Sequence, residues 1–167
     1  LRLDAPGTDR VKILPILVAA AVVSAATVAI GIRLWPIDPL TFHAEPLSAN
    51  KLSGQRDWLV RPGPGDGAAP VFADDPVDLM QKLAAVALAE PRTRQLAGSI
   101  GETWTTFVVR SQIIGFPDIV SVRTLPEGTG TTLAIWSRSR FGGYDWGVNR
   151  ARVERWIRAL GVPIGSN

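Results

Sequence analysis

The fold is decided by one continuous stretch of the chain, residues 131–153, which reads TTLAIWSRSRFGGYDWGVNRARV. Its first part, Thr131–Ser139, is rich in β-branched and aromatic side chains, and this composition predicts a strand. Its last part begins a helix that we expect over Gly147–Leu160, because apolar residues recur there at helical spacing and Gly161 and Pro163 follow. The stretch therefore predicts a sheet whose last strand leads through a glycine-rich loop into a helix.

Two further strands are expected upstream of this stretch. The runs Thr103–Ser111 and Asp118–Leu125 have the same strand-like composition, and the tight turn Pro126–Gly130 joins the last two strands into an antiparallel hairpin. Side chains alternate along the hairpin, so we expect one face to pack on a core and the face of Ser121 and Arg123 to remain polar.

A helix precedes the strands. Asp74–Pro76 combines an acidic N-cap with a proline in the first turn, and Glu90–Pro91 ends the apolar periodicity that follows it. The order of helix, three strands and helix predicts an α+β fold. We expect a small two-layer domain over residues 74–167, with an antiparallel sheet and flanking helices on one face.

The N-terminal part of the chain contains twenty residues without a charge, Ile13–Ile32. As a helix this segment is about 30 Å long, which matches the hydrocarbon core of a bilayer. Arg33 and Trp35 follow it directly, as is typical at a membrane interface. A cleaved signal peptide has a shorter apolar stretch. We therefore expect a single transmembrane helix at 13–32 after a flank at 1–12.

The flanking charges predict an orientation for this helix. The basic residues Arg2, Arg10 and Lys12 precede the span, whereas Arg33 and Lys51 are the basic residues in the twenty positions beyond it. The positive-inside rule then predicts a cytoplasmic N-terminus and a periplasmic C-terminal domain in a cell inner membrane.

The segment between span and domain, residues 33–73, is rich in proline and glycine. It has neither a helical nor a strand period, and each proline disfavours helix at the residue before it. We expect a tether that lies over the domain without a fold of its own. The sequence pattern assigns no role to His43, which lies in this segment.

The composition excludes several kinds of site. The chain has no cysteine, which excludes disulfides, thiolate zinc sites and iron–sulfur clusters, and its single histidine excludes a multi-histidine metal site. The net charge of +3 is too small to indicate nucleic-acid binding. We therefore expect no metal, no cofactor and no nucleic-acid partner.

The loop between the last strand and the last helix carries a family signature. The matching residues are Ser137, Arg138, Ser139, Arg140, Gly142, Asp145, Gly147, Asn149 and Arg152, in the pattern S-R-S-R-x-G-x-x-D-x-G-x-N-x-x-R, with Gly115-Phe116-Pro117-Asp118 upstream. With these residues the chain resembles the domain of unknown function 1499 family (DUF1499) over about Asp74–Leu160. It lacks the cysteine-containing segment with which many members open. The resemblance implies a small, often membrane-attached domain and no established activity.

Five residues of the motif form the candidate site: Arg138, Arg140, Asp145, Asn149 and Arg152. In a structural interpretation Asp145 caps the last helix near Gly147 and Val148, and Arg138 or Arg140 pairs with Asp145 or Asp118. In a functional interpretation the three arginines converge near the start of that helix and bind an anion, such as a phosphate or a lipid headgroup. Both interpretations remain open from the sequence.

Catalysis has little support in the sequence. Ser137 and Ser139 have no histidine near them to act as a base. Asp118 and Asp145 could form a carboxylate pair, but only their motifs suggest it. We therefore expect no catalytic residue.

Contacts with other proteins are better supported. The span is rich in small residues suited to helix packing. Five aromatic residues lie at or beyond position 136, namely Trp136, Phe141, Tyr144, Trp146 and Trp156. We expect a non-catalytic accessory or assembly subunit of a larger respiratory or photosynthetic membrane complex, in contact with membrane protein subunits and the lipid bilayer. The alternatives are a membrane-tethered module that binds an anion or lipid headgroup, and a carboxylate-dependent hydrolase.

Overall fold

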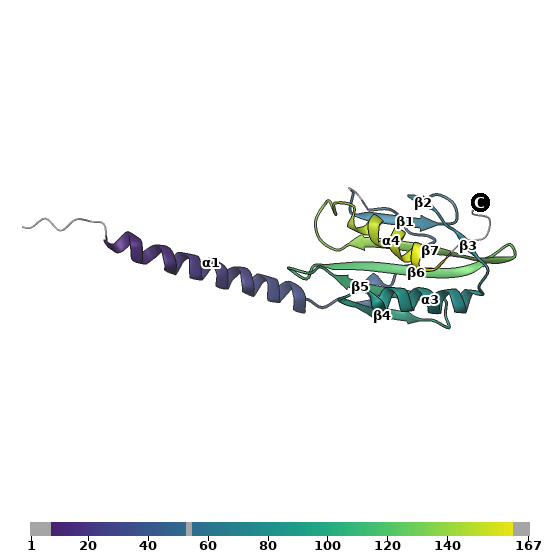
Figure 1. Cartoon of the computed structure of the whole chain (residues 1–167), viewed down its shortest axis with the longest axis horizontal. Coiled ribbons are helices and arrows are strands. Elements are labelled where there is room, and N and C mark those ends of the chain that lie inside the picture. Colours follow the sequence, from purple (N-terminus) through teal and green to yellow (C-terminus); the bar gives the residue numbers. More distant parts are fainter. Residues whose placement is uncertain (1–7, 53–54, 162–167) are drawn as a thin grey trace, which may run out of the picture. The chain divides into compact units, whose positions relative to one another are not determined.

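The computed structural model describes residues 8–52 and 55–161, which form an N-terminal helix and an α+β domain (Figure 1). Helix α1 spans Thr8–Leu34 and is longer at both ends than the expected span. Its segment Ile13–Leu34 is long and apolar enough to cross a membrane, and none of it is buried. Membrane anchors and signal sequences both have helices of this kind.

The domain is built around a seven-stranded sheet with the order β2-β1-β7-β6-β5-β4, in which β3 also pairs with β7. The strands are β1 (Asp57–Arg61), β2 (Gly67–Ala68), β3 (Val71–Phe72), β4 (Thr93–Ser99), β5 (Trp104–Arg110), β6 (Pro117–Glu127) and β7 (Gly130–Ser139). Strands β1 and β2 pair in parallel, and the other pairs are antiparallel. The sheet is therefore mixed, while the expected β6–β7 hairpin is confirmed.

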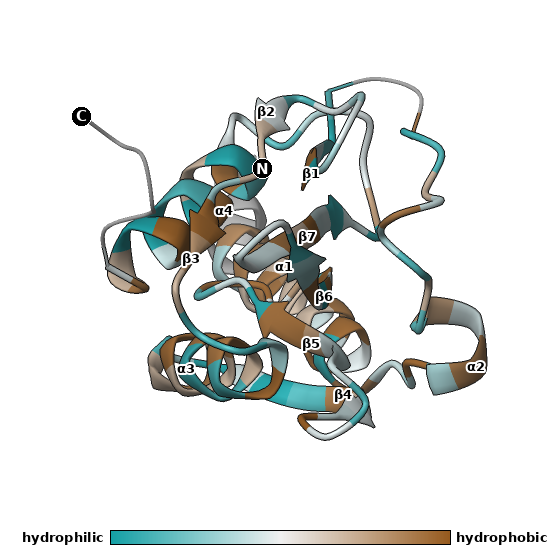
Figure 2. Ribbon diagram, turned by 90° about the vertical axis from the view of Figure 1, so that its right-hand side faces the viewer, coloured by the Kyte–Doolittle hydropathy of each residue, from teal (hydrophilic) through white to brown (hydrophobic). Residues whose placement is uncertain are grey.

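Two helices cover one face of the sheet, as expected. Helix α3 (Pro76–Ala89) begins where the Asp75 side chain accepts hydrogen bonds from two backbone N–H groups, and helix α4 is Val148–Ala159. Buried residues of both helices pack against the sheet in the main core, which contains Leu79, Met80 and Leu83 of α3, Val153 and Trp156 of α4, and Phe107, Val120 and Ile135 of the strands. Figure 2 shows hydrophobic residues on the central strands and alternating hydrophobic and hydrophilic residues along both helices.

The opposite face of the sheet was expected to stay polar; it carries polar residues such as Thr106, Ser121 and Arg138, but part of the chain covers them. The segment 37–52, which contains the short helix α2 (Pro39–Phe42), packs on this face through Ile37 and Ala49. Ser121 is fully buried as a result. Hydrophobic residues of the proline-rich segment pack on this face. The sheet is therefore covered on both faces, and the domain is not the expected two-layer fold.

His43 takes part in this cover. Its ring stacks on Trp104 with 3.9 Å between ring centroids, and Nδ1 lies 2.8 Å from the hydroxyl of Thr106. Burial lowers the pKa of the imidazole, and the carboxylates of Glu102 and Glu45 oppose that shift. The linker histidine is thus a packing residue of the domain.

The segment 33–73 is only partly the tether that the sequence predicted. Residues 57–72 contribute β1, β2 and β3 to the sheet, and β1 pairs with β7 from Asp57 to Val60. A five-residue strand beside a Pro/Gly-rich loop has too short a pattern to detect. Strand β4 was also missed, because its sequence TRQLAGS is poor in β-branched residues and lies at the edge of the sheet.

Candidate functional site

The alternation of strand β7 divides the signature motif between the two faces of the sheet. Ser137 contacts helix α4 on one face, whereas Arg138 contacts Phe42 of the covering segment on the other. Arg152, which lies on α4, bonds to Ser137. The predicted convergence of three arginines is therefore wrong: Arg138 and Arg140 lie on the face opposite Arg152.

On the helix-covered face, the motif forms a buried hydrogen-bond network. Asn149 accepts a hydrogen bond from the Ser137 hydroxyl at 2.6 Å and donates to the Ser139 hydroxyl at 3.1 Å. Arg152 donates to Ser137 at 3.0 Å and to Asn149 at 2.8 Å. Its other terminal nitrogen forms an ion pair with Asp118 at 2.8 Å, and Ser139 donates to the second oxygen of Asp118 at 2.7 Å.

This network joins helix α4 to strands β6 and β7. Arg152 and Asn149 are almost completely buried, at 4% and 0% exposure. The only other acid near Arg152 in the described chain is Glu90, 3.8 Å from Nε, which itself accepts a 2.6 Å hydrogen bond from the indole of Trp156. The Nε of Arg152 has no hydrogen-bond partner, whereas both of its terminal nitrogens are bonded. A hydrogen-bonded buried ion pair of this kind holds helix α4 to the sheet.

Asp145 caps helix α4, as predicted. One carboxylate oxygen accepts from the backbone N–H of Gly147 at 2.9 Å and the other from that of Asn149 at 3.0 Å. Arg138 does not form the predicted pair with an aspartate, because it donates to neutral oxygens. The arginine partner of Asp118 is Arg152, and no ion pair of Asp145 occurs among the described residues.

The loop between β7 and α4 presents aromatic side chains on the surface. Trp146 is 86% exposed and Tyr144 51% exposed, and their rings meet edge to face at 5.0 Å. Trp146 has a positive φ of 57°, an uncommon backbone conformation for a bulky residue. The five expected aromatics do not form one cluster, because Trp136 and Trp156 are buried in the domain.

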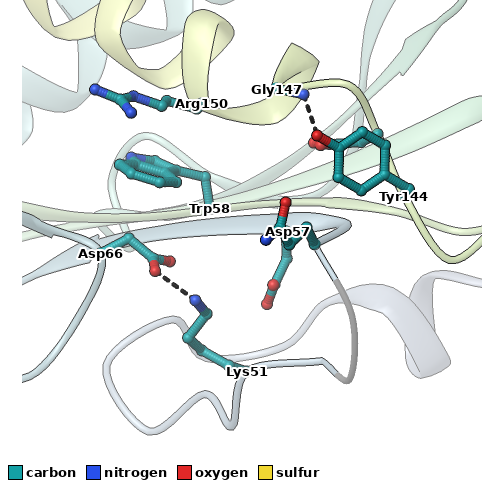
Figure 3. Close-up of a pocket in the computed structure, with 9 residues that line it drawn as sticks. Lys51, Asp57, Trp58, Asp66, Tyr144, Gly147 and Arg150 are labelled. Carbon is teal, nitrogen blue, oxygen red and sulfur yellow. Dashed lines mark hydrogen bonds and ion pairs between the residues drawn. The ribbon is translucent and has the colours of Figure 1, made fainter.

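A pocket of about 380 Å³ lies next to Tyr144 (Figure 3). Figure 3 shows Arg150 over the ring of Trp58, where the guanidinium carbon is 4.8 Å from the ring centroid, and Lys51 paired with Asp66. The lining residues are Lys51, Gln55, Asp57, Trp58, Asp66, Tyr144, Asp145, Gly147 and Arg150. Charges of both signs line the pocket, so it does not select an ion of one sign. Most of these residues belong to β1 and its flanks, which the sequence analysis did not identify as part of the sheet.

On the other face, Arg138 is buried at 6% exposure. Its guanidinium lies 4.0 Å from the centroid of the Trp136 ring and donates to the backbone oxygen of Phe42 at 2.7 Å and to the Ser121 hydroxyl at 3.1 Å. Burial lowers the pKa of Arg138 to about 10, and the charge of Asp57 opposes that shift.

Within residues 8–52 and 55–161, no group of three or more histidines, aspartates and glutamates is placed to hold a metal ion. The contacts of the motif residues include hydrogen bonds and an ion pair.

The family model described as "Protein of unknown function (DUF1499)" matches residues 35–160. The match covers most of the chain, and the chain belongs to this family. It begins before α2, so the segment 37–52 and strands β1–β3 are part of the family domain, which starts earlier than the expected Asp74. None of the curated proteins matches the chain.

Proposed function

We propose that this member of the DUF1499 family is a non-catalytic accessory or assembly subunit, anchored in a membrane by α1, that binds a larger membrane protein complex through the loop 140–147. The observation that carries the proposal is the exposure of Trp146, 86%, beside the half-exposed ring of Tyr144. Tryptophan and tyrosine are the residues most enriched among those that dominate binding energy at protein interfaces.

The geometry of the loop supports a docking role. The two hydrogen bonds of Asp145 hold the turn between Tyr144 and helix α4, so the aromatic pair is fixed before a partner arrives. A fixed side chain loses less conformational entropy on binding. The pocket of about 380 Å³ next to Tyr144 offers a recess for a side chain of the partner. A projecting ring beside a recess suits a complementary protein surface.

A hydrolytic role is less well supported by the same contacts. Both oxygens of Asp118 accept hydrogen bonds, from Ser139 and from Arg152. Both oxygens of Asp145 accept from backbone N–H groups. The hydrogen bonds of both carboxylates thus go to groups that hold helix α4 in place, and this supports a structural role for them.

The membrane part of the proposal is supported by helix α1. Its surface carries small side chains, including Ala19, Ala25 and Ala29, which allow another helix to approach closely. Thr27 donates its hydroxyl to the backbone oxygen of Val23 at 2.9 Å, so its polar group is satisfied within the helix. We place the N-terminus in the cytoplasm and the domain in the periplasm, in line with the excess of basic residues before the span. The partner class that we propose is a respiratory or photosynthetic complex.

The test is to isolate the full chain from its own membranes in a mild detergent, through a C-terminal tag, and to identify what co-migrates on native electrophoresis by mass spectrometry. The wild type should migrate with stoichiometric partners at high mass. Trp146→Ala should shift the protein to its free position. Leu88→Ala, which removes another exposed apolar side chain, on helix α3, should leave the complex intact.

Two results would contradict the proposal. Migration of the wild type alone, or as a small homo-oligomer, would exclude an accessory subunit. An intact complex in Trp146→Ala would exclude the loop as the docking site and direct attention to helix α1.

A further inference from the structure

A second pocket, of about 350 Å³, lies on the face of the sheet opposite α4 and combines arginines with apolar walls. Its lining residues are Phe42, Leu52, Arg56, Ile119, Arg138, Ser139, Arg140 and Phe141. Three guanidinium groups therefore share one opening with two phenylalanine rings. We call this the arginine pocket. It shares no lining residue with the pocket next to Tyr144, although Arg140 and Phe141 belong to the loop 140–147.

Among the described residues, no carboxylate pairs with the buried arginine of this pocket. Arg138 donates only to neutral oxygens, and within the described chain no carboxylate lies within 4.0 Å of its guanidinium. Its cross-strand neighbour Asp57 accepts through Oδ2 from the indole N–H of Trp136 at 2.9 Å and from the backbone N–H of Leu52 at 3.0 Å, and its Oδ1 has no hydrogen-bond partner. A buried charge without a paired counter-ion is costly.

Arg152, the other buried arginine of the motif, has a counter-ion within the domain. Arg152, at 4% exposure, has Asp118 at 2.8 Å. Arg138 is buried almost as deeply and has no such partner. Arg56 lies in the same pocket, and its Nε is buried without a hydrogen-bond acceptor, as is the Nε of Arg152. Arg138 thus has capacity for an anion that the described residues do not supply.

The surrounding charge is positive as well. Arg110 has a lowered pKa, first because of burial and then because the positive charges of Arg94 and Arg140 act on it. Guanidinium groups bind phosphate in a bidentate manner, which makes arginine the preferred residue for this anion. The negative charge of Asp57 weakens the positive potential in the arginine pocket, but one carboxylate does not cancel the charges of Arg56, Arg138 and Arg140.

The apolar walls select among anions. The guanidinium carbon of Arg140 is 5.0 Å from the ring centroid of Phe42 and 5.1 Å from that of Phe141. Leu52 and Ile119 complete the apolar lining. A small hydrated anion gains nothing from such walls, whereas an amphiphile can bury an apolar chain against them.

The pocket also lies close along the chain to the apolar helix. Phe42 follows the last residue of α1, Leu34, by eight positions. Eight residues span at most about 28 Å when fully extended. If α1 crosses a bilayer, Phe42 in the wall of the pocket therefore lies only eight residues along the chain from the end of the membrane-spanning helix. Lipid headgroups are then the phosphates available at the highest local concentration.

We propose that the arginine pocket binds the phosphate headgroup of an anionic amphiphile, with Arg56, Arg138 and Arg140 on the phosphate and the phenylalanine rings against the apolar chain. This binding uses Arg140 and Phe141 at the start of the loop 140–147 and does not use the exposed rings of Tyr144 and Trp146. It gives the domain a lipid ligand in addition to any protein partner.

The test uses the full-length protein, purified in an uncharged detergent and examined by native mass spectrometry with added lipid. Phosphatidylglycerol should bind at least about tenfold more tightly than phosphatidylcholine, as expected when charge-assisted hydrogen bonds discriminate. Arg140→Gln and Arg56→Gln should each lose most of that preference. Arg158→Gln is the matched control, because this arginine is exposed on α4 and away from the pocket.

Arg138→Gln is included only if circular dichroism shows that this variant is folded, since Arg138 is buried. If it is not folded, Arg140→Gln and Arg56→Gln test the proposal without it. A second titration with inorganic phosphate distinguishes the two sources of the anion. Lipid binding that depends on Arg140 and Arg56 supports the proposal. Binding of inorganic phosphate without any binding of phosphatidylglycerol would overturn it in favour of a free anion. Equal binding of both lipids, or unchanged binding by Arg140→Gln, would also overturn it.

Discussion

Replacing Arg152 by alanine should lower the free energy of unfolding of the domain by about 3–5 kcal/mol, the range measured when one partner of a buried ion pair is removed. Arg152 is 4% exposed and forms an ion pair with Asp118 at 2.8 Å. Its removal would leave that carboxylate with only the Ser139 hydroxyl as a donor. It would also take one hydrogen bond each from Ser137 and Asn149.

The effect can be measured by urea unfolding of the full-length protein in an uncharged detergent, followed by tryptophan fluorescence and circular dichroism. Arg158→Ala is the control: this arginine lies on the exposed side of α4, in an exposed pair with Glu154. Exposed pairs of this kind contribute at most about 1 kcal/mol. A double variant, Arg152→Met with Asp118→Asn, should be more stable than Arg152→Ala, because no buried charge is left unpaired.

One outcome would refute this reasoning. If Arg152→Ala unfolds within about 1 kcal/mol of the control, the buried network does not hold helix α4, and the serines and arginines of the motif would need another explanation.

Two further predictions test the packing of the segment 37–52. Gly98→Ala should lower the free energy of unfolding by at least about 2 kcal/mol, because φ is +77° and a Cβ would lie 2.0 Å from the backbone oxygen of Trp104. Gly101→Ala is the control, since a Cβ there meets open space. Equal thermal unfolding midpoints for the two variants would contradict this prediction. Stability should fall as the pH drops below about 6.5, because burial depresses the pKa of His43 in the folded state while the unfolded chain takes up the proton at its ordinary pKa of 6.5. Unfolding midpoints between pH 5.5 and 7.5 check this, and His43→Gln should remove that part of the pH dependence.

The elements that the sequence predicts well are those with long local patterns. Helix α3 has an acidic cap and proline at one end and a stop at the other, and strands β6 and β7 are long runs joined by a tight turn. Strand β1 has five residues and becomes a strand only by pairing with β7, far along the chain. Local periodicity cannot report such a pairing.

The site was predictable to the same extent. The Asp145 cap depends on residues two and four positions away, so the motif itself contains the information. The partner of Asp118 depends on the register that places β6 beside β7 and α4 over both, and no local pattern identifies Arg152 rather than Arg138 or Arg140. The separation of the arginines had a signal, however, because neighbouring positions of a strand point to opposite faces.

The S-R-S-R sequence of the motif therefore serves two surfaces of one strand. Ser137 and Ser139 belong to the network that holds α4, and this helix positions the aromatic loop. Arg138 and Arg140 face the other way and line the arginine pocket. A slip of one residue in β7 would exchange these faces and bury the wrong groups on both sides. The two roles are thus separable by substitution: Arg152→Ala should affect stability, whereas Arg140→Gln should affect lipid binding in a domain that remains folded.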